Sequence, residues 1–148
     1  MAVLIENRKA RFNYEILEKF EAGIELLGFE VKSIKNKRGS LDGSYMAVRG
    51  NEVFVLNLDI PPYQTGNTPA GYDTRRERRL LLTRQEIKKL IGLESRKGLT
   101  VVPISVYTKK NRVKLELAVV RGKKKSDKRE TIKKRDTERE MRREMKNS

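Results

Sequence analysis

The sequence predicts a mainly β fold: a small six-stranded antiparallel barrel with peripheral helices, followed by a basic C-terminal tail. Three observations support this prediction. Apolar and polar residues alternate over much of residues 1–120, which is the period of half-buried strands. Turn-forming residues divide the alternating stretches at short intervals. Residues 121–148 lose the alternation and are dense in charge.

The first predicted strand covers residues 12–20, where apolar side chains recur at even spacing as on one strand face. Residues 22–27 then predict one or two helical turns. Gly28 would end them, because glycine adopts the left-handed conformation at low cost. Residues 29–34 resume the alternation and predict a second strand. Glu21 would therefore stand at the corner between the first strand and the short helix.

Two more strands are predicted at residues 44–49 and 52–60. Gly50 and Asn51 between them favour a tight hairpin turn, because both residues tolerate a positive φ. Apolar residues on both faces of the second strand indicate that it is well buried. Pro61 would end it, because proline cannot continue a ladder of hydrogen bonds.

A loop rich in Gly, Pro, Asn and Thr is predicted at residues 64–74. Tyr63 and Tyr72 beside and within it could stack on bases, as aromatic rings do in single-strand recognition. Tyrosines in such places more often pin a loop to the body of the protein, and we favour that interpretation here.

A basic run at residues 75–79 leads into three leucines and then into a predicted helix. Thr83 and Glu86 have capping-box spacing, in which the hydroxyl and the carboxylate each accept a hydrogen bond from an exposed backbone N–H. An apolar stripe follows at helical spacing, and Gly98 would end the helix.

The clearest hairpin joins residues 100–107 to residues 112–120. Pro103 indicates that the first of these strands has a free edge or a bulge. Six short, largely antiparallel strands with two helices fit a closed or partly open barrel, for which the oligonucleotide-binding type is the natural candidate. Other small α+β barrels would fit the same pattern.

The chain carries a net charge of +15 over 148 residues and has neither cysteine nor histidine. This charge favours a polyanionic partner, because clustered Lys and Arg release counterions from phosphates. Disulfides, thiolate zinc sites and histidine acid–base chemistry are excluded by composition. With no apolar run of membrane-spanning length and no signal-peptide core, we expect a cytoplasmic protein that does not contact membrane.

Residues 121–148 carry net charge +7, nearly half of the total in a fifth of the chain. Because the few apolar residues of this segment cannot offset the entropy lost on ordering, we expect a tail that is disordered when free. Asp127 and Glu130 are nevertheless spaced as a helix cap, and the tail has favourable i,i+4 charge pairs. A helix that forms on contact with a polyanion is therefore predicted. We divide the chain into a barrel, 1–120, and this tail.

Catalysis has weak support in the sequence. A two-metal nuclease would need several converging carboxylates, and the sequence has no Asp-x-Asp motif and no Gly-rich phosphate loop. We interpret the available carboxylates as surface or capping groups and expect a binding protein, not an enzyme, with no metal or cofactor. These carboxylates are Glu21, Glu30, Asp42, Asp59 and Asp73.

By residue type alone, Glu21, Leu81 and Lys114 have ordinary interpretations. Glu21 would form a salt bridge, although a carboxylate could also accept hydrogen bonds from base N–H groups or a 2′-OH. Leu81 would be a core residue, and Lys114 would be solvated on the outer face of a strand.

Five segments of the chain form a distinctive combination. They are residues 20–24 (Phe-Glu-Ala-Gly-Ile), 30–34 (Glu-Val-Lys-Ser-Ile), 78–82 (Arg-Arg-Leu-Leu-Leu), 97–103 (Lys-Gly-Leu-Thr-Val-Val-Pro) and 121–124 (Arg-Gly-Lys-Lys) with 127–129 (Asp-Lys-Arg). Together, in this order and over nearly the whole chain, they resemble one known family, small protein B (SmpB), the SsrA-binding protein family.

The resemblance implies a bacterial cytoplasmic protein with an oligonucleotide-binding-like barrel that grips the tRNA-like domain of transfer-messenger RNA (tmRNA, SsrA RNA). It would bring this RNA, charged with alanine, to ribosomes stalled without a usable stop codon, for trans-translation. Elongation factor Tu would be a further partner via alanyl-tmRNA. The motifs place Glu21, Leu81 and Lys114 at family RNA-contact positions. The predicted RNA-binding set also includes Lys32, Arg78 and Arg79.

The resemblance further implies that the tail enters the vacant decoding site and the empty mRNA channel as a helix. One departure concerns Ser126, which stands where family members often carry Tyr or His, so a stacking role at this position is in doubt. The predicted ribosome-contacting residues are Gly122, Lys123, Lys124, Asp127, Lys128, Arg129, Ile132, Lys133 and Lys134.

The alternative function is that of a general basic ribosomal or RNA-chaperone protein, which coats RNA through charge alone. Such a protein would lose affinity for all RNAs equally as salt rises, whereas a specific binder keeps a preference for one RNA shape.

Overall fold

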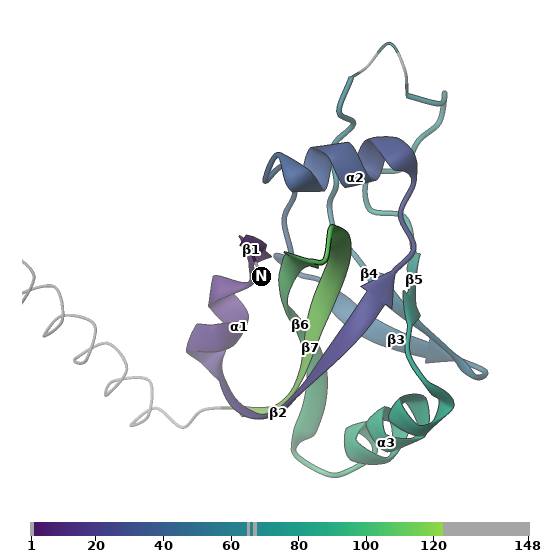
Figure 1. The fold of residues 1–148 in the computed structure, drawn as a ribbon. Helices are drawn as coiled ribbons and strands as arrows, with labels where there is room; N and C mark the ends of the chain where they lie inside the picture. The colour runs from purple at the N-terminus through teal and green to yellow at the C-terminus, as the bar shows by residue number, and fades with distance from the viewer. Residues whose placement is uncertain (1, 65, 67, 123–148) are drawn as a thin grey trace, which may run out of the picture.

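The computed structural model describes residues 2–64, 66 and 68–122, and these form one curved antiparallel sheet with three helices (Figure 1). The strand order is β1-β6-β7-β2-β5-β4-β3. The edge strand β3 also lies against β6, so the sheet curls into a partly open barrel. The strands are β1 (Ala2–Glu6), β2 (Tyr14–Ile24), β3 (Tyr45–Arg49), β4 (Glu52–Leu56), β5 (Arg78–Leu81), β6 (Leu99–Lys109) and β7 (Arg112–Gly122).

The helices are α1 (Arg8–Asn13), α2 (Gly28–Lys35) and α3 (Arg84–Glu94). α2 lies across one end of the curved sheet and α3 lies at the opposite end (Figure 1). The predicted capping box of α3 is confirmed. Thr83 accepts from the Glu86 N–H at 3.2 Å, and Glu86 accepts from the Thr83 N–H at 3.0 Å.

The prediction for residues 22–34 is wrong in both of its parts. Residues 22–24 are not helical but continue β2, because Ala22 and Gly23 pair with β7 and Gly23 and Ile24 pair with β5. The predicted strand at 29–34 is helix α2, and Gly28 begins this helix instead of ending one. Glu30 stabilises the start of this helix, since its carboxylate accepts a hydrogen bond from the Leu27 N–H at 2.7 Å.

The sheet has seven strands, one more than predicted, because β1 and β5 were missed while the strand predicted at 29–34 is helix α2. Helix α1 was also missed. β5 has only four residues and begins inside the basic run. The predicted strand at 52–60 ends at Leu56, because Asn57 adopts a positive φ of 60°. In the preceding hairpin turn, Gly50 has a positive φ of 63°.

The predicted hairpin at residues 100–120 is confirmed as β6 and β7. Its turn places Lys110 and Asn111 at positive φ, as a tight hairpin turn requires. Pro103 marks a register shift between β6 and β7, so it stands at a bulge and not at a free edge. The Pro103 carbonyl is also satisfied, since the Asn7 side-chain amide donates to it at 3.0 Å.

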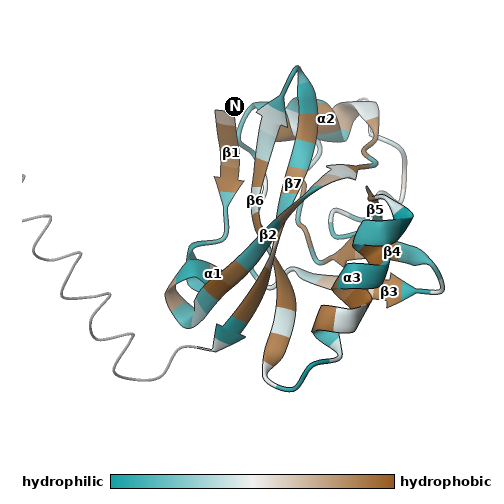
Figure 2. Cartoon of the chain, turned by 60° about the horizontal axis from the view of Figure 1, so that its bottom comes forward, coloured by the Kyte–Doolittle hydropathy of each residue, from teal (hydrophilic) through white to brown (hydrophobic). Residues whose placement is uncertain are grey.

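Apolar side chains from every strand meet inside the barrel. Figure 2 shows hydrophobic and hydrophilic stretches alternating along the strands, which leaves one face of each for the interior. Fully buried core residues include Ala22, Ile34, Val53, Val55, Leu58, Ile60, Leu90, Leu115 and Leu117.

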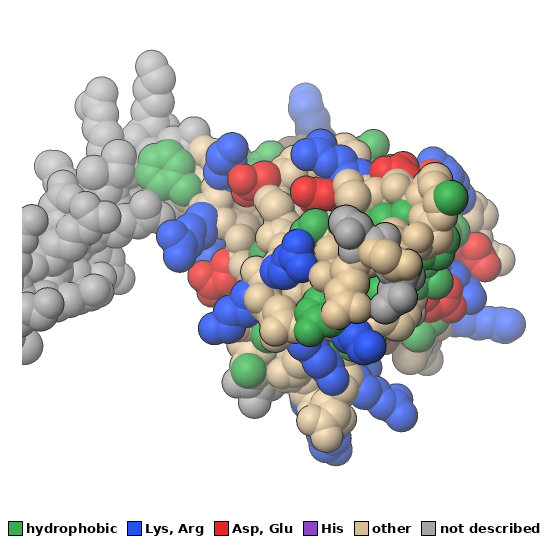
Figure 3. Space-filling view, turned by 90° about the horizontal axis from the view of Figure 1, so that it is seen from above, with side chains coloured by type: hydrophobic (Ala, Val, Ile, Leu, Met, Phe, Trp, Pro, Cys, Tyr) green, Lys and Arg blue, Asp and Glu red, His purple; other side chains and the backbone are tan. Residues whose placement is uncertain are grey.

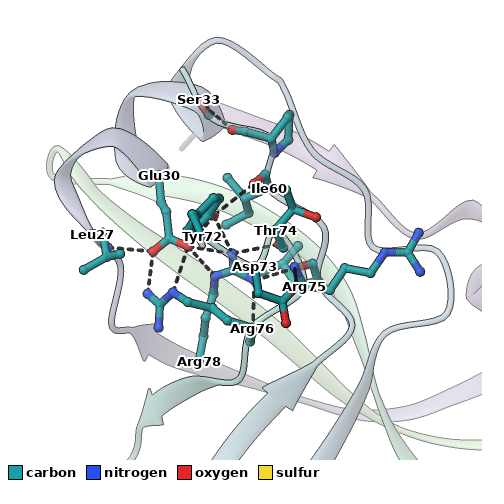
Figure 4. A network of polar contacts seen from close by, with 12 residues as sticks. Leu27, Glu30, Ser33, Ile60, Tyr72, Asp73, Thr74, Arg75, Arg76 and Arg78 are labelled. Atoms are coloured by element: carbon teal, nitrogen blue, oxygen red, sulfur yellow. Dashed lines mark hydrogen bonds and ion pairs between the residues drawn. The ribbon is translucent and has the colours of Figure 1, made fainter. Parts of the chain in front are cut away.

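One ion pair is buried completely within this interior. The side chains of Glu30 and Arg78 are both 0% exposed. Arg78 Nε donates to Glu30 Oε2 at 2.9 Å, and Tyr72 donates its hydroxyl to the same oxygen at 2.8 Å (Figure 4). Arg76 Nε also donates to Glu30 Oε2, at 3.1 Å. The interpretation that Tyr72 pins its loop to the body of the protein is confirmed.

Arg78 also closes the loop that precedes β5. Its guanidinium donates to the backbone carbonyls of Leu58, Thr74 and Arg76. The ion pair therefore joins helix α2, the residues just after β4 and the start of β5 at one point. Burial alone would raise the pKa of Glu30, but hydrogen bonds from Arg76, the Leu27 N–H, Arg78 and Tyr72 outweigh it and hold this pKa below its ordinary value.

We expect Glu30→Gln to lower the free energy of unfolding at pH 7 by about 3–5 kcal/mol, because it leaves Arg78 buried without its counter-ion. Urea unfolding followed by circular dichroism measures this. Glu52→Gln is the matched control, since Glu52 and its partner Arg79 are about half exposed and such pairs contribute less than about 1 kcal/mol. Equal effects of the two variants would contradict a special role for the buried pair.

The stability difference between wild type and Glu30→Gln should also depend on pH. A carboxyl group whose pKa is lowered by folding stabilises the native state above its unfolded pKa, about 4.3, and loses that contribution as pH falls through the folded value. Unfolding free energies measured between pH 7 and pH 3 should therefore converge below about pH 4.3. A difference that stays constant over this range would show that Glu30 does not titrate as argued.

Candidate RNA-binding surface

The strand register brings three predicted RNA-contact residues together on the outer face of the barrel. Gly23 in β2 pairs with Leu81 in β5 on one side and with Lys114 in β7 on the other. Residues directly opposite each other in antiparallel strands share a face, so Leu81 and Lys114 flank Gly23. Glu21 is two residues earlier on the same strand and points to the same side.

Leu81 is exposed and not in the core, contrary to what its residue type alone suggests. Its side chain has 49% relative exposure, whereas its neighbour Leu80 has 2%. A Cβ added at Gly23 would lie 3.1 Å from the Leu81 Cβ, so a larger residue at position 23 would require the Leu81 side chain to shift by a few tenths of an ångström. An exposed leucine at a glycine gap offers an apolar contact for the flat face of a base or ribose.

The carboxylate of Glu21 is held from one side. The Tyr107 hydroxyl in β6 donates to Glu21 Oε2 at 2.6 Å, and Lys109 Nζ donates to the same oxygen at 3.3 Å. The bond from Tyr107, aided by Lys109 and the charge of Lys114, lowers the pKa of Glu21 below its ordinary value despite some desolvation. The salt-bridge interpretation of Glu21 is thus confirmed, with Lys109 as the partner.

Two adjoining hollows give this face its shape. One is lined by Glu21 and four cationic side chains, from Lys109, Lys110, Arg112 and Lys114. The other, of about 280 Å³, has an apolar lining that includes Leu26, Val31 and Leu81, with Arg112 and Lys114 also lining it. The cations can bind phosphates here, Glu21 can accept a hydrogen bond from a base N–H or a 2′-OH, and Leu81 can pack against a base.

Sequence reasoning missed Tyr107, Lys109 and Arg112. The hairpin was predicted, but with residues 108–111 as its turn, which would pair Tyr107 with Arg112. The observed turn is tighter, with Lys110 and Asn111 at positive φ, so Tyr107 pairs with Lys114 and Lys109 pairs with Arg112. Asn111 was the available signal for this tighter turn, because asparagine tolerates a positive φ.

The other predicted contact residues have different surroundings. Lys32 is exposed on α2 and lines a hollow with Phe29 and Tyr63, so it stays available as a contact. Arg79 is exposed and pairs with Glu25 at 3.4 Å. The prediction for Arg78 is corrected: its side chain is completely buried against Glu30 and cannot reach RNA without opening the core.

Lys and Arg side chains also surround the α2 end of the barrel, with fewer Asp and Glu among them (Figure 3). Exposed residues on and just after α2, such as Lys35, Lys37 and Arg38, extend the cationic surface beyond the two hollows. This distribution suits an extended anionic partner.

Of the predicted tail contacts, only Gly122 lies within the described residues. It is the last residue of β7 and pairs with Tyr14, so the sheet extends two residues past the expected boundary at 120. The remaining predicted tail contacts, 123–134, lie outside the described residues, as does Ser126.

Within residues 2–64, 66 and 68–122, no three acidic side chains come together in a way that could hold a metal ion. None of the helices in that part of the chain has the length and apolar character needed to cross a membrane.

Comparisons with known proteins agree with the resemblance noted in the sequence. The family model described as SmpB protein matches residues 4–147. The SsrA-binding protein of Trichodesmium erythraeum is 49% identical over 144 residues, covering 97% of this chain and 92% of the relative. That of Clostridium acetobutylicum is 50% identical over 145 residues, covering 98% and 93%.

A solved structure shows the same fold. A chain described as "tmRNA-SmpB: a journey to the center of the bacterial ribosome" superposes with a TM-score of 0.68 at 40% identity, covering 89% of this chain and 95% of that one. The family match along nearly the whole sequence, with relatives about half identical over their lengths, shows that this chain belongs to the SmpB family.

Proposed function

We propose that this protein binds the tRNA-like domain of tmRNA through the outer face of its barrel and delivers it to stalled ribosomes for trans-translation. The observation that carries the proposal is the convergence of Glu21, Leu81 and Lys114 on one exposed face, in a chain of the SmpB family. The names of its relatives and of the similar solved chain, which include SsrA-binding and tmRNA-SmpB, support the same partner.

Each group on this face has a separate part in binding. Lys109, Arg112 and Lys114 attract phosphates and supply affinity that depends on salt. Glu21 accepts a hydrogen bond from a base N–H or a 2′-OH, which phosphate contacts cannot reproduce. Leu81 packs against a base or ribose at the glycine gap. The combination recognises one arrangement of backbone, donor and apolar surface instead of charge alone.

A protein that only coats RNA would have no use for this arrangement. A carboxylate among cations weakens attraction for phosphates, and an exposed leucine adds nothing to charge-driven binding. The presence of both at the centre of the face therefore favours selective binding over the alternative of a general basic RNA chaperone. We place the function in the cytoplasm, where ribosomes work, and assign it to binding without catalysis.

The C-terminal tail, residues 121–148, is the proposed ribosome-reading segment. Its net charge of +7 suits an mRNA channel lined by phosphates, and a channel already filled by message would leave it no space. β7 ends at Gly122, beside Tyr14 and at the end of the hairpin away from the Lys109–Arg112 turn. The proposed RNA face and the origin of the tail are thus at opposite ends of one hairpin. Contact with elongation factor Tu stays a prediction.

Glu21→Ala should weaken binding to the tRNA-like domain by about tenfold, although it makes the protein more basic, because a charge-assisted hydrogen bond is lost. The measurement is a fluorescence titration at moderate salt with excess elongator tRNA as competitor. Glu94→Ala is the matched control, since it removes the same charge from the end of α3. Unchanged or tighter selective binding by Glu21→Ala would contradict the proposed contact.

Replacing Asp127, Lys128 and Arg129 together by alanine in the full-length chain should leave binding to the tRNA-like domain within about twofold of wild type. Peptide tagging on stalled ribosomes should be lost, because the tail and the barrel face bind different targets. Tagging is measured in a reconstituted translation system with a message that lacks a stop codon. Normal tagging by this variant would show that the three residues are dispensable.

A further inference from the structure

A buried tyrosine lies next to the proposed RNA contacts and is not one of them. Tyr107 lies on β6 and is only 4% exposed, yet its hydroxyl reaches the exposed carboxylate of Glu21 at 2.6 Å. β6 and β2 are not neighbours in the sheet, because β7 lies between them. The hydrogen bond therefore spans a strand and links Glu21 to a side chain fixed in the barrel wall.

The position of Glu21 needs such a link, because its cross-strand partner has the same charge. Glu116 on β7 stands directly opposite Glu21, and like charges in that position repel. The nearest cation to Glu116 is Lys19, at 3.7 Å, and Glu116 Oε1 is a buried oxygen with no hydrogen bond. Nothing on Glu116 can therefore hold the Glu21 carboxylate in place.

Lys109 is the other partner of Glu21, but it is a weaker constraint. Its ammonium lies 3.3 Å from Oε2 on a flexible side chain that is 46% exposed. An exposed pair of this kind restricts a carboxylate little. The Tyr107 ring is buried, so the position of its hydroxyl oxygen is fixed and only the O–H bond can rotate. The hydrogen bond from this hydroxyl therefore defines the direction of the Glu21 carboxylate.

We propose that Tyr107 is a positioning residue for RNA recognition: its hydroxyl holds Glu21 Oε2 so that Oε1 is presented to a hydrogen-bond donor of the bound RNA. Glu21 Oε1 makes no hydrogen bond to any described residue, so it has accepting capacity to offer. This inference rests on the proposed function, since it concerns the same face and the same RNA.

The chemistry of the tyrosine agrees with a donor role. Burial and the neighbouring Glu21 carboxylate raise the pKa of Tyr107 above its ordinary value. The hydroxyl consequently stays protonated at physiological pH. Because a carboxylate held in advance loses less entropy on binding, the arrangement improves affinity without touching the RNA.

The test is a double-mutant cycle on binding of the full-length chain to the tRNA-like domain of tmRNA. Tyr107→Phe removes only the hydroxyl and should weaken binding about fivefold when Glu21 is present. In the Glu21→Ala background the same change should have almost no effect, because nothing remains to be positioned. The slope of log affinity against log salt should not change, because no phosphate contact is removed.

Controls separate positioning from simple loss of structure. Tyr45→Phe is the matched variant, since Tyr45 is exposed on β3 and should leave binding unchanged. Thermal unfolding of every variant reports on folding. An equal loss from Tyr107→Phe in both backgrounds would overturn the inference and assign Tyr107 a purely structural part.

The outcomes also distinguish this inference from the proposed function. If Glu21→Ala weakens binding and Tyr107→Phe does not, the Glu21 contact stands and the positioning role is wrong. If neither variant changes binding, both fail together. If wild type shows no preference for the tRNA-like domain over elongator tRNA, the proposed function itself is wrong.

Discussion

The buried ion pair between Glu30 and Arg78 is the interaction on which the arrangement of this barrel depends. Removing two charges from water is costly, and such pairs often contribute little net stability. Here the cost is offset by further hydrogen bonds, from Tyr72 and Arg76 to the carboxylate and from the guanidinium to three backbone carbonyls. No apolar pair could satisfy these groups, so the pair specifies where the surrounding segments meet.

The pair also determines which side chains of β5 point outward onto the proposed RNA face. β5 is four residues long and joins β2 through only two residue pairs, Gly23 with Leu81 and Ile24 with Leu80. A strand this short could slip, and a slip of one residue would exchange its two faces. Because Arg78 must point inward to meet Glu30, Leu81 three positions later must point outward. A core interaction therefore places Leu81, a proposed RNA-contact residue, on the surface.

The sequence predicted the parts of this structure that depend on local pattern. The β6–β7 hairpin, the α3 capping box and the β3–β4 hairpin each follow from residues close together in the chain. The error at residues 22–34 has a different origin. The pattern there fits helix and strand almost equally, and pairing with β5 and β7, together with the buried Arg78 partner of Glu30, decides between them. Contacts with residues so distant in the chain cannot be inferred from the local sequence pattern.

The same limit applies to the candidate site. By residue type alone, Glu21 was interpreted as salt-bridged, Leu81 as a core residue and Lys114 as a solvated residue. Only the resemblance to a family suggested that they contact RNA. Their convergence comes from strand register. Arg78 was included in the predicted RNA-binding set, and its burial corrects that prediction, because an arginine within a motif can equally serve the core.

The charge arrangement of the proposed RNA face would favour selectivity at some cost in affinity. Cations alone would attract every RNA, and steeply so at low salt. Glu21 lowers that general attraction, and only an RNA that offers a donor at the right place recovers the loss. On the proposed function, the gain is largest when the carboxylate is already held, because Tyr107 and Lys109 both donate to Oε2 and leave Oε1 for the RNA. A held acceptor within a cationic face would thus disfavour RNAs that present phosphate alone.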